Sequence, residues 1–168
     1  MRVEIYTDGA CSNNGKPNSV GGWAVIMRAM RKKTSNKREC VAEKVFTGNK
    51  APTTNNEMEL KAILVALQNL KPKSIKGHSY HIYTDSKYCI KCVTEWIEIW
   101  HNNGWRTVEN TPVKNREIIE NIYNLMQIYN PTFHWVKGHA KNALNNRADE
   151  LAVKAKLELM EELELVGG

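Results

Sequence analysis

Apolar and polar side chains alternate over three segments in the first third of the chain, as they do in β-strands with one buried face. The segments are residues 3–8, 21–27 and 40–46. The polar stretch Arg31–Lys37 separates the second segment from the third and is expected to form their turn. Three strands in succession predict an antiparallel meander.

From about Thr54 the apolar spacing changes to three and four residues, which is the period of a helix. Its apolar stripe consists of Ile63, Ala66, Leu67 and Leu70, and Thr54, Asn55 or Asn56 is expected to cap it. Further strands are predicted at 80–85 and 132–136, and helices from residue 86 and over 93–104, 115–129 and 146–165. This order predicts an α/β fold with a mixed five-stranded sheet, three antiparallel strands and then parallel ones, flanked by helices.

Length and composition place the chain among ordinary globular proteins. Its 168 residues, 42% hydrophobic and 25% charged, suffice for one domain over 1–168, with a core of about 3–155 and a C-terminal helix reaching about 165. No apolar run approaches the roughly 20 residues of a membrane helix. Met1–Asp8 carries acids where a signal peptide would be apolar. We therefore expect a cytoplasmic protein with no membrane partner.

The charge is unevenly distributed along the chain. The net charge is +6, and the segment Arg28–Lys44 holds seven bases against two acids. A basic cluster is more often a solvated hairpin than a binding face, so it permits a polyanionic partner without requiring one. Cys89 and Cys92 form a CxxC pair without a second pair, and we interpret them as structural thiols rather than zinc ligands.

Two strand segments resemble each other: Ile5-Tyr6-Thr7-Asp8 and Ile82-Tyr83-Thr84-Asp85. Parallel neighbouring strands would place Asp8 and Asp85 at the same end, about 4.8 Å apart. Two carboxylates that close repel each other, so one takes a proton or a cation lies between them. The alternative is that Asp8 is a turn residue and Asp85 a helix cap, but the repetition favours a paired site.

Two helical acids extend this pair to four. Glu59 precedes Ile63 by four residues and therefore lies on the core-facing stripe of its helix, where an acid is costly unless it is paired or metal-bound. Asp149, in the first turns of the last helix, would by itself be explained by the helix dipole. An all-carboxylate set selects Mg²⁺ or Mn²⁺ and suits in-line phosphoryl transfer with two ions.

Five motifs together resemble type 1 ribonuclease H, in the order of that family and over residues 3 to about 155. They are Tyr6-Thr7-Asp8-Gly9, Thr54-Asn55-Asn56-Glu57-Met58-Glu59-Leu60, Tyr83-Thr84-Asp85-Ser86, Trp135-Val136-Lys137-Gly138-His139-Ala140 and Asn146-Arg147-Ala148-Asp149-Glu150-Leu151-Ala152. The resemblance implies a ribonuclease H-like fold and endonucleolytic cleavage of the RNA strand of RNA–DNA hybrids, leaving 5′-phosphate and 3′-hydroxyl ends.

The resemblance also implies roles for individual residues. Asp8, Glu59, Asp85 and Asp149 would hold two Mg²⁺ ions, with Mn²⁺ as a possible substitute. His139 would assist proton transfer or product release, for which a pKa near 6.5 is suitable. The implied hybrid contacts are Asn14, Asn55 and Asn56 in the minor groove, Thr54 and Asn115 at a DNA phosphate, and Tyr88 and Trp96 against the DNA strand, with Trp100 and Trp105 less favoured.

The sequence departs from the family pattern at the segment that packs against DNA, called the handle. The handle is normally rich in lysine, yet residues 94–115 hold three acids and two bases. The first loop, Asp8–Trp23, also lacks the Gly/Pro-rich run of many bacterial members, and we expect no separate hybrid-binding domain. The alternatives are a ribonuclease H domain of a reverse-transcriptase type and a catalytically weak hybrid-binding module. We expect a monomer.

Overall fold

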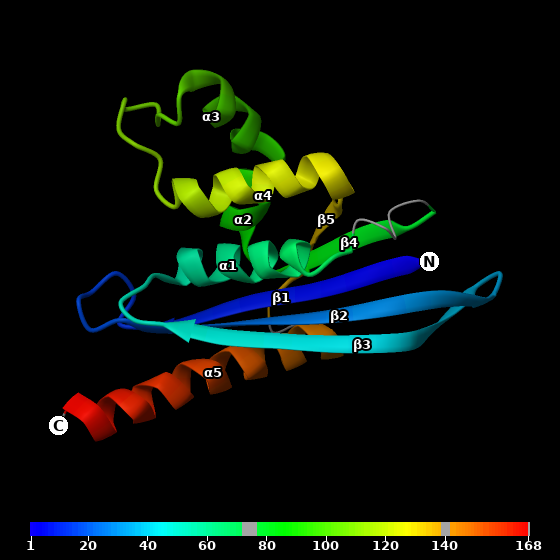
Figure 1. Cartoon of the computed structure of the whole chain (residues 1–168), viewed down its shortest axis with the longest axis horizontal. Coiled ribbons are helices and arrows are strands. Elements are labelled where there is room, and N and C mark those ends of the chain that lie inside the picture. Colours follow the sequence, from blue (N-terminus) through cyan, green and yellow to red (C-terminus); the bar gives the residue numbers. More distant parts are fainter. Residues whose placement is uncertain (72–76, 139–141, 168) are drawn as a thin grey trace.

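The computed structural model describes residues 1–71, 77–138 and 142–167. Its centre is a five-stranded sheet in the order β3-β2-β1-β4-β5 (Figure 1). Strands β1 (Arg2–Ser12), β2 (Val20–Thr34) and β3 (Lys37–Lys50) are antiparallel, and β4 (Ser79–Thr84) and β5 (Thr132–Trp135) add to β1 in parallel. The predicted mixed sheet is therefore confirmed.

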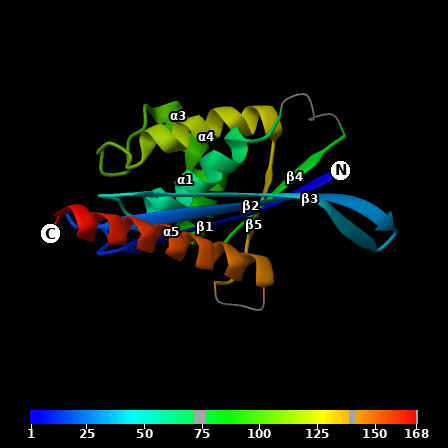
Figure 2. The same cartoon turned by 60° about the horizontal axis from the view of Figure 1, so that its bottom comes forward.

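Helices cover both faces of this sheet. Helices α1 (Asn55–Gln68) and α4 (Arg116–Tyr129) lie over one face, and α5 (Ala143–Gly167) crosses the other, as Figures 1 and 2 show. Helices α2 (Lys87–Lys91) and α3 (Ile97–Asn103) are joined by a π-helical turn over Cys92–Trp96; α2 lies next to α1, and α3 stands beyond α4 (Figure 1). Gly104, with a φ of 76°, ends α3 in the left-handed conformation that glycine adopts without strain.

The main core lies between the sheet and α1. Its sheet side is formed by Ile5, Val25 and Ile82, and its helix side includes Ile63 and Leu67, all fully buried. Thr54 is the N-cap of α1, because its hydroxyl oxygen accepts a hydrogen bond from the Glu57 backbone amide. This cap holds the first turn of α1, and Glu59 lies in the turn that follows.

The predicted turn lies within Arg31–Lys37 but is much shorter than expected, since β2 continues to Thr34 and β3 begins at Lys37. Only Ser35 and Asn36 connect the two strands, which extend as a ribbon past the N-terminus in Figure 1. The alternation of apolar residues stops where the ribbon leaves the core, because both of its faces are then solvated and no burial pattern marks the strand. The first loop is likewise shorter than expected, running only from residue 13 to 19.

Candidate active site

The two similar strand segments are paired in register. Ile5 lies opposite Ile82 and Tyr6 opposite Tyr83 in the parallel pair β1–β4, and Asp8 and Asp85 each follow two residues later. The expected parallel pairing is thus confirmed. The strand β1 does not end at Asp8, however, because residues 9–12 continue to pair with β2 after β4 has ended. Asp8 therefore stands at the point where the sheet loses its β4 side.

Glu59 joins these two acids from α1. Carboxylate oxygens of Asp8, Glu59 and Asp85 all lie within 4.8 Å of one another. Gly9 makes this approach possible: a Cβ at that position would lie 2.6 Å from the Glu59 backbone nitrogen. A side chain at residue 9 would push α1 away from β1, so the glycine determines how near Glu59 comes to Asp8.

Asp149 reaches the same region from α5, on the other face of the sheet. It is half-buried, and its side-chain hydrogen bond to Asp8 is one cause of the raised Asp8 pKa. Gly22 allows α5 to lie against β2, since a Cβ there would collide with the Ala152 carbonyl oxygen. Asp149 lies outside the tight group formed by the other three acids.

Burial makes this acidic group electrostatically costly. Asp8 and Glu59 are only 2% and 4% exposed. Burial, followed by the charge of Asp85, raises the pKa of Asp8 to about 8. Burial and then the charge of Asp8 raise the pKa of Glu59 well above its ordinary value. Without a cation, the site therefore retains protons at neutral pH.

The free oxygen atoms of the group fit a cation. Asp8 Oδ2 and Glu59 Oε2 are buried and have no hydrogen-bond partner among the described residues. Buried carboxylate oxygens without donors are costly, and a divalent ion with oxygen ligands would satisfy them. Within the described ranges, these acids are the only group of three or more His, Cys, Asp or Glu side chains close enough to share an ion. The site therefore fits divalent metal binding.

Four of the expected substrate residues lie together at the start of α1. The Asn14 side-chain oxygen accepts a hydrogen bond of 2.9 Å from the Asn55 backbone amide, next to the Thr54 cap. Asn56 follows on the exposed side of the helix. The loop after β1 and the first turn of α1 thus form one polar edge beside the acids.

The aromatic residues of the expected handle form a chain of ring contacts. Tyr88 contacts Trp96, Trp96 contacts Trp100, and Trp100 contacts Trp105, with centroid distances of 5.6 to 6.3 Å. Trp105 is buried, whereas Tyr88, Trp96 and Trp100 are half-buried against the core. The Tyr88 hydroxyl also shares a hydrogen bond with the side chain of Asn115. Packing thus accounts for Trp105, while Tyr88 and Trp96 retain exposed surface.

The sequence did not predict the positions of two residues near the acids, Trp135 and Lys87. Trp135, 46% exposed, donates its indole N–H to the Asp85 carbonyl oxygen, and the Lys87 ammonium lies 5.1 Å from its ring centroid. No spacing in the sequence marks this pair. His139 lies outside the described residues. The neighbouring Gly138 lies against Asp85, since a Cβ there would be 3.0 Å from Asp85 Oδ2.

Comparison with known proteins agrees with the fold. Residues 1–156 match the family model described as RNase H. A ribonuclease H of Bradyrhizobium diazoefficiens is 42% identical over 93% of both chains, and one of Legionella pneumophila is 43% identical over 90% of this chain and 94% of its own. A ribonuclease H of Treponema denticola is 39% identical over 95% of this chain and its own full length.

Solved structures show the same architecture. LC9-RNase H1, a type 1 RNase H with the type 2 active-site motif, superposes with a TM-score of 0.75 at 26% identity, over 92% of this chain and 72% of its own. A foamy viral protease-reverse transcriptase in complex with an RNA/DNA hybrid superposes with a TM-score of 0.74 at 19% identity, over 92% of this chain and 20% of its own, which shows the fold alone.

The mixed sheet and its acids place the molecule among enzymes with the ribonuclease H-like fold. Within this class, the family match over nearly the whole chain is decisive. The chain belongs to the RNase H family.

Proposed function

We propose that this protein hydrolyses the RNA strand of RNA–DNA hybrids endonucleolytically, leaving 5′-phosphate and 3′-hydroxyl ends. The observation that carries the proposal is the buried group of Asp8, Glu59 and Asp85, with two unpartnered oxygen atoms, in a chain of the RNase H family. Acids held this closely are stable as carboxylates only beside cations, and phosphodiester hydrolysis requires cations at the attacking and leaving oxygens.

The proposed cofactor is a pair of Mg²⁺ ions, with Mn²⁺ as a substitute, held by Asp8, Glu59, Asp85 and Asp149. When bound, the ions supply an activated water and stabilise the charge of the leaving oxygen. The carboxylates orient the ions: Asp8, between α1 and α5, is suited to serve both. His139 is proposed to move a proton or to aid product release, because histidine is the side chain whose charge changes most readily near neutral pH.

Recognition of the hybrid is assigned to the polar edge and the aromatic chain. Asn14, Asn55 and Asn56 are proposed to contact the minor groove, where 2′-hydroxyls distinguish RNA from DNA. Tyr88 and Trp96 would pack against deoxyribose, where a 2′-hydroxyl would be excluded.

Thr54 and Asn115 are proposed to hold a DNA phosphate. The surroundings of Asn115 support this role, because it borders a hollow of about 710 Å³ whose lining includes Lys61 and Arg116. Cations beside a phosphate contact would strengthen it.

Two further expectations remain proposals. These are that the protein is a monomer and that it lies in the cytoplasm. We also propose a single domain over residues 1–168, which the one sheet formed by the described residues supports. Among the described residues, no helix is both long and apolar enough to cross a bilayer. The four acids, all present, favour an active enzyme over a weak hybrid-binding module.

The decisive experiment is incubation with a labelled RNA–DNA hybrid, an RNA duplex and a DNA duplex, each with Mg²⁺ and with chelator. We expect cleavage of the RNA strand in the hybrid alone, and only with Mg²⁺ or Mn²⁺. Cleavage of all three duplexes, or full activity in chelator, would refute the proposal. Loss of hybrid cleavage in Asp8→Asn with retained hybrid binding would distinguish this site from a contaminating nuclease.

A further inference from the structure

A cationic hollow lies where the β2–β3 ribbon leaves the sheet, at the N-terminal end of β1. Its volume is about 360 Å³, and the residues that line it include Met1, Arg2, Lys32, Arg38 and His78. The remaining lining residues are uncharged, so no Asp or Glu borders it. A concave surface lined by one sign of charge concentrates a ligand of the opposite sign.

Two of these cations face each other directly. Lys32 and Arg38 are paired in the register of β2 and β3, and like charges at directly opposite positions destabilise a strand pair. The adjacent pair has opposite charges, which stabilise a strand pair: Arg31 lies opposite Glu39 and forms an ion pair with it. Lys32 and Arg38 have no carboxylate partner among the described residues. An anion between them would relieve the repulsion.

The neighbouring strands add to the same positive field. The Arg2 guanidinium donates a 2.7 Å hydrogen bond to the Tyr83 hydroxyl, which holds it on this face of the sheet. Burial, then the charge of Arg2, and more weakly that of Arg38, lower the pKa of His81. His78 Nδ1, in the lining, is buried without a hydrogen-bond partner. Arg2 is, however, ion-paired with Glu4 at 3.2 Å, and the charge of Glu4 opposes that of Arg2 at His81. The positive charge without a carboxylate partner among the described residues is therefore that of Lys32 and Arg38.

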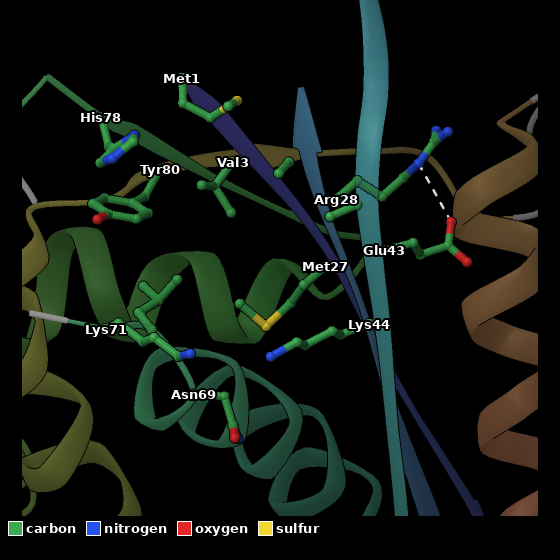
Figure 3. Close-up of a pocket in the computed structure, with 13 residues that line it drawn as sticks. Met1, Val3, Met27, Arg28, Glu43, Lys44, Asn69, Lys71, His78 and Tyr80 are labelled. Carbon is green, nitrogen blue, oxygen red and sulfur yellow. Dashed lines mark ion pairs between the residues drawn. The ribbon is translucent and has the colours of Figure 1, made fainter. Parts of the chain in front are cut away.

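An adjacent pocket provides an internal contrast. It shares Met1 and His78 with the hollow, has a volume of about 240 Å³ and is walled by apolar side chains and the Tyr80 ring (Figure 3). Lys44 and Lys71 lie at its edge. These two lysines are exposed and carry the same total charge as Lys32 and Arg38, but they border a largely apolar wall in which Arg28 is ion-paired with Glu43.

We propose that the hollow binds a backbone phosphate of the nucleic acid, outside the segment that is cleaved. This inference rests on the proposed function. Arg2 precedes Asp8 by six residues on β1, which is about 20 Å at roughly 3.3 Å per residue. At about 3.4 Å per nucleotide, the hollow is reached only by a duplex that extends more than about six base pairs from the acids. It would supply the phosphate contact that the acidic handle lacks.

The test compares two charge-matched double variants, Lys32→Gln/Arg38→Gln and Lys44→Gln/Lys71→Gln, in an Asp8→Asn background with Mg²⁺. Binding to a 40-base-pair and a 10-base-pair hybrid is measured from 50 to 300 mM salt. We expect the first variant alone to weaken binding of the long hybrid about five- to tenfold. Its salt slope should fall by about 0.9, the contribution of one phosphate contact. The short hybrid should bind equally well to both variants.

Equal losses of affinity for the long hybrid in the two double variants would overturn the proposed phosphate site, because such losses would reflect the change in net charge alone. An equal loss for both hybrid lengths would also overturn it. A titration with inorganic phosphate separates the sources of the anion: shifts of the Lys32 and Arg38 NMR signals without any dependence on hybrid length would indicate a free-anion site and refute the backbone assignment. If the wild-type chain cleaved no hybrid, the proposed function would be refuted, whatever the salt dependence of binding.

Discussion

Like charges are crowded in two regions of this molecule, and the two regions differ in every other respect. The acids Asp8, Glu59 and Asp85 converge from two strands and a helix into a buried group. The bases of the β2–β3 ribbon lie on two adjacent strands and are largely exposed. Water screens the charges of the second group, whereas Asp8 and Glu59 in the first group are almost completely buried and are screened poorly. The acids therefore require protons or cations to remain together, whereas the bases tolerate their repulsion.

The largest expected effect comes from removing a charge from the buried group. Asp8→Asn should lower the rate of hybrid cleavage by about a thousandfold, because a ligand shared by the proposed ions is lost. Single-turnover cleavage of a labelled hybrid measures this rate. The control is Glu57→Gln. This variant removes from α1 an acid that is paired with Lys50, and it should change the cleavage rate less than about threefold. Comparable losses in both variants would contradict the assignment.

The close approach of α1 to β1 is the next most sensitive feature. Gly9→Ala should lower the free energy of unfolding by about 3 kcal/mol, because the added Cβ meets the backbone of Met58 and Glu59 rather than a movable side chain. Cleavage should fall together with stability, since Glu59 moves with the helix. Urea unfolding and cleavage assays measure the two effects. If Gly9→Ala had the wild-type free energy of unfolding and the wild-type cleavage rate, Gly9 would not determine the distance between α1 and β1.

The protonation of the buried group predicts an unusual pH dependence of stability without metal. Asp8 has a folded-state pKa raised to about 8, above its unfolded value, so the folded chain binds the proton more tightly. The metal-free protein should therefore lose stability, on the order of 2 kcal/mol, as the pH rises from about 4 to 8.

Urea unfolding in chelator tests this dependence. Asp8→Asn should flatten the curve, and Mg²⁺ should restore stability at pH 8 in the wild type but less in the variant. A metal-free protein that is more stable at pH 8 than at pH 5 would show that the acids do not repel one another.

A smaller effect is expected at the polar edge. Asn14→Ala removes the acceptor for the Asn55 amide and a proposed contact to the RNA strand. The KM for the hybrid should rise about tenfold with little change in kcat, since a hydrogen bond is worth about 1 kcal/mol or somewhat more at a charged group. The matched control is Asn36→Ala, in the distant ribbon turn, which should leave KM unchanged. A fall in kcat alone would place Asn14 in the chemical step.

The local periodicity of the sequence alone predicted most of the helices and strands and indicated the candidate acids. The repeated Ile-Tyr-Thr-Asp segments predicted the β1–β4 pairing, and the position of Glu59 four residues before Ile63 predicted its burial. Both inferences depend on the order of residues within one strand or one helical turn, which a sequence displays directly.

The remaining features depend on distances between segments far apart in the chain. The length of the ribbon, the pairing of Lys32 with Arg38 and the contact of Trp135 with Asp85 follow from strand register and packing. Gly9 matters only because α1 returns to touch it about fifty residues later. Hydrophobic periodicity records which side of an element is buried, but it does not record which neighbour covers that side or how closely; only the packed structure decides those distances and, with them, the electrostatics of the site.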